Sequence, residues 1–153
     1  MLVKCRTLYN ETKLVPAESL IQRPSVYGSV IHEGKLLVVQ GQYTHRYVLP
    51  GGGIEKGESI EAALIREVRE ETSLDIEVKA FLHFETDFFY YDPLDLALHG
   101  FLFFYRCKPL TVELTTPDYP PEEGLVMPLW VDISQLCPES FESHGELFMR
   151  LIS

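Results

Sequence analysis

The sequence is poor in cysteine, and its cysteines are far apart. Cys5, Cys107 and Cys137 are the only three in 153 residues, and no C-x-x-C pair occurs. A zinc knuckle needs paired cysteines and a disulfide framework needs an even set of them, so neither is expected. We expect three reduced thiols, as is usual in a cytoplasmic protein.

Long hydrophobic runs are also missing. No apolar stretch approaches the roughly 20 residues that a membrane-spanning helix needs. The chain runs from Met1–Val3 directly into Lys4 and Arg6, without the apolar core of a secretory leader. A membrane span and a secretory leader are therefore not expected.

Positive charge is scarce. The chain has 13 Lys and Arg residues against 23 Asp and Glu residues, which gives a net charge of −10. Binding to duplex nucleic acid normally requires a basic surface, so it is not expected. An acidic protein can still bind an anionic small molecule if metal cations mediate the contact.

Repeats, low-complexity tracts and composition shifts are absent, so we expect one domain over residues 1–153. The residue patterns predict strands and helices that would form a mixed sheet flanked by helices. The predicted elements are a strand with a loop in the first 22 residues, a hairpin over 26–40, a glycine-rich loop over 47–59, a helix after it, strands over 74–91 and 96–108, a loop over 115–124, a strand over 127–133 and a helix over 143–152.

The helix after the glycine-rich loop has an unusual inward face. Positions 60, 64, 67 and 71 are spaced four, three and four apart and therefore form one stripe. The stripe begins with Ile60 and Leu64 and ends with Glu67 and Glu71, and Glu70 lies at its edge. Neighbouring carboxylates repel one another and are costly to bury. A bound cation such as Mg²⁺ would remove both costs.

The alternative interpretation is a helix end near the surface, where Arg66 and Arg69 neutralise solvated glutamates. The preceding segment PGGGIEKGE favours the metal site, because glycines let the backbone approach a phosphate or a metal closely. This segment is not a P-loop, since no G-K-[ST] follows, and it is not G-x-G-x-x-G.

Loop and helix together resemble the signature of the Nudix hydrolase family, G-x5-E-x7-R-E-U-x-E-E-x-G-U, where U is a bulky aliphatic residue. The signature spans residues 52–74 and departs from the family at one position, where Ser73 replaces a glycine that would suit a left-handed helix end. The matching residues are Gly52, Glu58, Arg66, Glu67, Val68, Glu70, Glu71 and Leu74.

The resemblance, to MutT-like nucleoside diphosphate-X hydrolases, implies an α/β/α sandwich with a mixed sheet and hydrolysis of a pyrophosphate bond. Arg66 would orient a glutamate, and Glu58 would support the metal from outside its ligand set or through water. The residues implied to hold Mg²⁺ or Mn²⁺ are Glu67, Glu70, Glu71 and the carbonyl of Gly52.

Two sources of the general base stay open. Some members of the family use a glutamate of the signature, which here would be Glu67 or Glu71, and others use an acid on a later loop. Glu122 and Glu123 are the candidates on that loop, although two loop acids can equally serve solubility.

The substrate is less well determined. Arg23 and Arg46 could bind phosphate, or could be ordinary surface charges. Aromatic residues of the strand over 74–91 could stack on a base, or could belong to the core. These residues are Phe84, Phe88, Phe89, Tyr90 and Tyr91. The last two resemble a tyrosine of the dinucleoside polyphosphate branch of the family.

A (deoxy)nucleoside triphosphate is the default substrate, and dinucleoside polyphosphates and ADP-sugars are alternatives. Two classes without catalysis also stay open: a Nudix-like module that only binds nucleotides, and an unrelated metal-binding protein. We expect a small-molecule partner and a monomer or homodimer.

Overall fold

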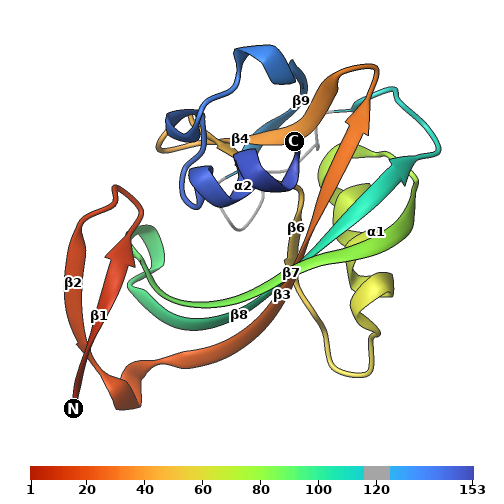
Figure 1. The fold of residues 1–153 in the computed structure, drawn as a ribbon. Helices are drawn as coiled ribbons and strands as arrows, with labels where there is room; N and C mark the ends of the chain where they lie inside the picture. Colours follow the sequence, from red (N-terminus) through yellow and green to blue (C-terminus); the bar gives the residue numbers. More distant parts are fainter. Residues whose placement is uncertain (116–124) are drawn as a thin grey trace.

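Within residues 1–115 and 125–153, which the computed structural model describes, nine strands form one mixed, curled sheet (Figure 1). Its order is β2-β1-β7-β8-β3-β4-β5, with β6 paired to β3 and β9 paired to β4. The strands are β1 (Leu2–Thr7), β2 (Thr12–Pro16), β3 (Ile21–His32), β4 (Lys35–Gly41), β5 (Tyr47–Val48), β6 (Gly51–Gly53), β7 (Ile76–Tyr91), β8 (Leu96–Pro109) and β9 (Leu125–Asp132).

Two helices, α1 (Ile60–Thr72) and α2 (Gly145–Leu151), lie on opposite faces of this sheet (Figure 1). Side chains alternate along β4, so Leu36 joins the core cluster of Phe148 on α2, while Leu37 joins that of Leu64 on α1. The predicted α/β/α sandwich is thereby confirmed. Among the described residues, no helix has the length and apolar character that crossing a bilayer requires.

All three cysteines are free, as expected. Cys5 and Cys107 are buried, and burial raises the pKa of Cys107 to about 12. A thiol with so high a pKa is a poor nucleophile. These two residues therefore act as small core side chains.

The loop predicted over residues 47–59 is partly wrong, because it contains β5 and β6. The three glycines of β6 pair with β3, Gly51 opposite Tyr27 and Gly53 opposite Ser25. A Cβ on Gly51 would lie 2.0 Å from the carbonyl oxygen of Val26, and Gly51 has a φ of +151°. Glycine is needed here because the two backbones approach too closely for any side chain.

The first 22 residues contain a second strand that the sequence did not predict. β1 and β2 form an antiparallel hairpin, and β1 also pairs in parallel with the end of β7. Cys5 and Val15 of this hairpin pack with Tyr90 and Ala97 in a small core of their own. The hairpin thus extends the sheet beyond β7 (Figure 1).

Ser73 ends α1 in the left-handed conformation, with φ 67° and ψ 7°. Its N–H donates to the carbonyl of Arg69. The helix therefore ends as it would with glycine at this position, and the serine carries the steric cost of a Cβ in that conformation.

Replacing Ser73 by glycine is expected to stabilise the protein by up to about 1 kcal/mol, because it removes this steric cost. Urea unfolding curves would measure the gain. Ser73→Ala is the matched control, since it keeps the Cβ and should bring no gain. A destabilised glycine variant would contradict the expectation.

Candidate active site

Helix α1 carries the predicted inward stripe of acids. Ser59 caps the helix by accepting a hydrogen bond from the N–H of Ala62 over 3.1 Å. Leu64 and Glu71 are buried, while Arg69 on the opposite face is exposed. The sequence prediction of which face turns inward is confirmed.

Glu67 and Glu71 lie against the glycine strand β6. The N–H of Gly51 donates to Glu71 Oε1 over 2.8 Å, and Glu71 is only 8% exposed. The carboxylate of Glu67 lies where a side chain on Gly52 would be, since a Cβ there would meet its oxygens at 2.8 Å. The absence of a side chain on Gly52 thus makes room for Glu67, while the backbone N–H of Gly51 holds Glu71.

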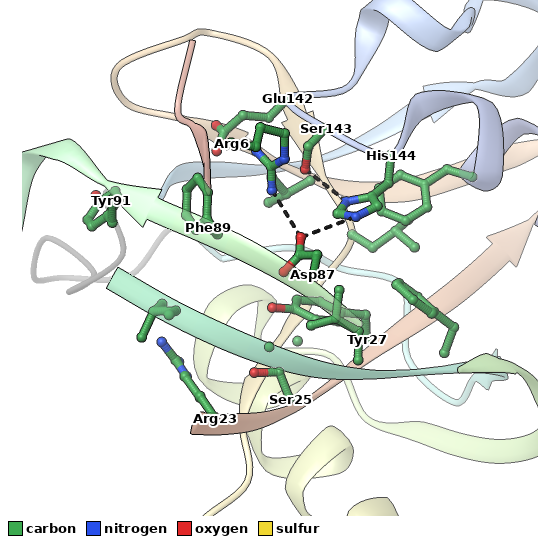
Figure 2. Close-up of a pocket in the computed structure, with 18 of the residues that line it drawn as sticks. Arg6, Arg23, Ser25, Tyr27, Asp87, Phe89, Tyr91, Glu142, Ser143 and His144 are labelled. Carbon is green, nitrogen blue, oxygen red and sulfur yellow. Dashed lines mark hydrogen bonds and ion pairs between the residues drawn. The ribbon is translucent and has the colours of Figure 1, made fainter. Parts of the chain in front are cut away.

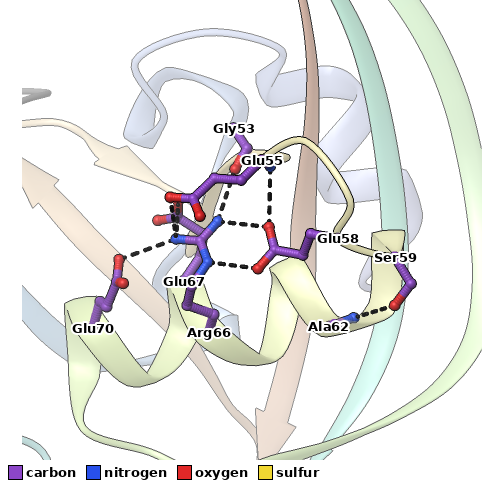
Figure 3. Close-up of polar contacts among 8 residues, drawn as sticks. All are labelled: Gly53, Glu55, Glu58, Ser59, Ala62, Arg66, Glu67 and Glu70. Carbon is purple, nitrogen blue, oxygen red and sulfur yellow. Dashed lines mark hydrogen bonds and ion pairs between the residues drawn. The ribbon is translucent and has the colours of Figure 1, made fainter.

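Arg66 joins the glycine segment to the acids of the helix (Figure 3). It donates to Glu58 from Nε at 2.7 Å and from Nη2 at 3.0 Å, and to the carbonyl of Gly53 at 3.0 Å. Its Nη1 lies 3.0 Å from Glu67 and 3.3 Å from Glu70. These bonds raise the pKa of Arg66, and its guanidinium lowers the pKa of Glu58 to about 2. Both groups are therefore ionised at neutral pH.

The three acids expected to hold a metal do not all converge in this structure. Arg66 pairs with both Glu67 and Glu70, but the side chain of Glu70 is 50% exposed, whereas Glu67 and Glu71 lie against β6. In the described part of the chain, no three acidic, His or Cys side chains are grouped closely enough to form a ready metal site. The donors still fit a hard cation, because they are carboxylate oxygens on adjacent helical turns, and the carboxylate of Glu67 lies directly against Gly52.

A pocket of about 390 Å³ opens on the other side of β6 (Figure 2). Gly51 lines it, and so does Arg23, whose Nε would lie 2.9 Å from a Cβ on Gly53. Tyr91 and Phe89 of β7 contribute aromatic walls. The strand β6 therefore separates the acids of α1 from a pocket large enough for part of a nucleotide.

Three charged or titratable side chains converge at the end of this pocket away from Arg23 (Figure 2). Arg6 Nη2 lies 3.2 Å from Asp87 Oδ2, and His144 Nε2 lies 3.3 Å from the same oxygen. Burial would raise the pKa of Asp87, but His144 and Arg6 outweigh it and lower that pKa. Asp87 is therefore ionised at neutral pH.

The structure separates the predicted substrate residues into two groups. Arg23 and Tyr91 line the pocket. Arg46 is exposed between β4 and β5 and does not line it, and Tyr90 packs in the small core beneath the N-terminal hairpin. Glu122 and Glu123 lie outside the described residues.

The sequence patterns did not predict Arg6, Asp87 or His144, the residues that meet at the far end of the pocket. One signal was available, because positions 87, 89 and 91 alternate and place an acid and two aromatics on one face of β7. Arg6 and His144 gave no signal, since each is an isolated residue more than 50 positions from Asp87.

Comparison with known proteins supports the family resemblance. The sequence profile of the NUDIX domain matches residues 22–151. An ADP-ribose pyrophosphatase of Methanocaldococcus jannaschii is 36% identical over 61 residues, which are 38% of this chain and 36% of that protein. The chain therefore matches only about a third of this relative's length.

Solved structures share the fold. An ADP-ribose pyrophosphatase from Streptococcus suis superimposes with a TM-score of 0.60 at 18% identity, over 85% of this chain and 86% of that chain. A NUDIX hydrolase from Nitrosomonas europaea superimposes with a TM-score of 0.66 at 14% identity, over 99% of this chain and 85% of that chain. At such low identity the similarity concerns the fold alone.

Proposed function

This chain belongs to the NUDIX family, and we propose that it hydrolyses the pyrophosphate bond of a small nucleoside diphosphate derivative with the help of Mg²⁺ or Mn²⁺. The observation that carries this proposal is the position of β6. Glu67 and Glu71 lie on one side of its glycines, and the pocket with Arg23 lies on the other. A diphosphate at these glycines would reach both the acids and the pocket.

The acids of α1 would hold the cation, with the carbonyl of Gly52 as a further ligand. A divalent cation offsets the charge of a diphosphate and lowers the pKa of a bound water. Arg66 keeps Glu67 oriented from 3.0 Å away, and Glu58 fixes Arg66 in turn. Arg23 would bind a phosphate oxygen at the mouth of the pocket.

Two features favour a sugar-linked substrate such as ADP-ribose over the nucleoside triphosphate that the sequence suggested by default. The relative from Methanocaldococcus jannaschii is named as an ADP-ribose pyrophosphatase. The pocket also continues well beyond Arg23 to Asp87 and His144. A triphosphate and a dinucleoside polyphosphate are the second candidates.

The test is a panel of ADP-ribose, UDP-glucose, a diadenosine polyphosphate and nucleoside triphosphates, each assayed with Mg²⁺ and with Mn²⁺. We expect a nucleoside monophosphate and a sugar phosphate from the best substrate. Binding without any release of product would instead favour a module that only binds nucleotides. If no compound is bound or cleaved, the proposed function is wrong.

Metal binding should also stabilise the fold, because a cation that binds only the folded state shifts the equilibrium by mass action. At a concentration a hundredfold above Kd the gain is about 2.7 kcal/mol, which corresponds to a rise in Tm of several degrees. Melting curves in EDTA and in excess Mg²⁺ measure it. The Glu67→Gln variant should lose most of the rise in Tm that Mg²⁺ causes. The Glu61→Gln variant, which changes an exposed residue of the same helix, should keep it. The absence of a shift in the wild type would count against the metal site.

A further inference from the structure

The far end of the pocket is built in part by a segment outside the matched family domain. The NUDIX match begins at residue 22, but Arg6 of β1 lines the pocket. β1 reaches β7 through two parallel pairs, Arg6 with Phe89 and Thr7 with Tyr90. The N-terminal hairpin therefore supplies a wall that the matched domain does not contain.

Contacts with Phe89 and Asp87 of β7 hold Arg6 there. Its guanidinium lies 4.5 Å from the ring centroid of Phe89, and its Nη2 pairs with Asp87. Both side chains of the pair are partly buried, at 27% and 19% exposure. Gly100 lies opposite Asp87, and a Cβ on it would come within 3.0 Å of Asp87 Oδ1. The carboxylate is thus fixed in orientation, and glycine leaves it room.

The charges along the pocket differ between its two ends. At the end beside β6, Arg23 lies close to Gly53. At the far end, the charge of Arg6 is matched by Asp87, and Glu142 adds a second carboxylate whose pKa is raised by burial. A phosphate would therefore be attracted at the first end and would meet carboxylates at the second.

The far end offers hydrogen-bond acceptors beside apolar walls. Asp87 accepts from its neighbours and has further lone pairs, and the hydroxyl of Ser143 lies 3.1 Å from His144 Nδ1. Phe89 and Tyr91 form the walls. Such a surface suits an uncharged group that carries hydroxyl donors.

We propose that Arg6 and Asp87 determine specificity, by selecting a nucleoside diphosphate linked to an uncharged, hydroxyl-bearing group such as a sugar over a nucleotide that ends in a phosphate. This inference rests on the proposed function and names the substrate class of the same site. Its physical basis is repulsion. Arg6 pairs with Asp87, and His144 lies 3.3 Å from carboxylate oxygens of both Asp87 and Glu85, so these two groups are matched by acids and do not compensate a terminal phosphate near Asp87 and Glu142.

The test compares kcat/KM for ADP-ribose and for ATP, which share an ADP group and differ in the group attached to its terminal phosphate. Asp87→Asn should lower the preference for ADP-ribose by about tenfold, because it removes a repulsive charge and keeps the shape of the side chain. Arg6→Gln should change the preference in the opposite direction, because it leaves Asp87 uncompensated. Lys4→Gln removes the same charge from an exposed position of the same strand and should leave the preference unchanged.

Binding gives a second readout that does not depend on turnover. In EDTA, the nucleotide with the higher kcat/KM should also cause the larger rise in Tm. Arg6→Met, which also removes the charge and keeps much of the length of the side chain, serves if the glutamine variant does not fold. The proposal is supported if Asp87→Asn and Arg6→Gln shift the preference for ADP-ribose in opposite directions. A merely structural role of these residues would instead lower kcat/KM for both substrates equally. If both variants still bind or cleave nucleotides with the wild-type preference, this inference alone is overturned. If the wild type binds no nucleotide at all, the proposed function is overturned.

Discussion

Replacing Glu71 by glutamine is expected to lower kcat by roughly 10²–10⁴-fold while the protein stays folded. The glutamine carbonyl can still accept the hydrogen bond that Gly51 donates over 2.8 Å to Glu71 Oε1. The side chain keeps its size but loses the negative charge that a divalent cation requires. The measurement is kcat on the best substrate of the panel at saturating Mg²⁺, together with a melting curve in EDTA.

Glu61→Gln is the control for this variant. It removes the same charge from an exposed position on the first turn of α1, away from β6. We expect its kcat to match the wild type. A Glu71→Gln protein that retains a tenth of wild-type activity would show that Glu71 is neither an essential ligand nor the base.

Replacing Gly51 by alanine is expected to destabilise the protein by about 3 kcal/mol or more. The new Cβ would lie 2.0 Å from the carbonyl oxygen of Val26 and 2.7 Å from the Cα of Tyr27. Both are backbone atoms of β3, which cannot move without disturbing the pairing of β3 with β6 and β8. Since Gly51 also donates to Glu71, the acid would lose its position at the same time.

Gly57→Ala provides the comparison for this change. Gly57 also has a positive φ, +81°, but nothing lies within 4 Å of a Cβ built on it. Only the conformational cost of about 1 kcal/mol should remain. Urea unfolding of both variants separates the two effects, and equal losses of stability would mean that the contact with β3 is not what requires glycine at position 51.

Helix α1 could be predicted because everything that decides it is close in sequence. Ser59 caps a segment of strong helix formers, and the spacing of Leu64, Glu67 and Glu71 is enough to assign the inward face. The long strands β7 and β8 were predicted within a few residues for a similar reason. Their apolar and aromatic runs are continuous and are bounded by turn residues.

Strands β1 and β6 depend on partners that are distant in sequence. The glycines of β6 have no strand propensity of their own, and they form a strand because β3 supplies its partners at Ser25, Val26 and Tyr27. In the same way, β1 is fixed to the sheet by the end of β7, more than 80 positions away. Local patterns carry no information about such pairings.

The sequence by itself determined the chemistry of the signature: which acids share one face of α1, and that glycines precede them. Only the tertiary structure decided what lies across β6. Arg6, Asp87 and His144 come from the beginning, the middle and the end of the chain, and they meet because β1, β7 and the segment before α2 converge on one pocket. No spacing along the chain encodes that meeting, since contacts between distant residues arise from the way the strands pair and the layers pack.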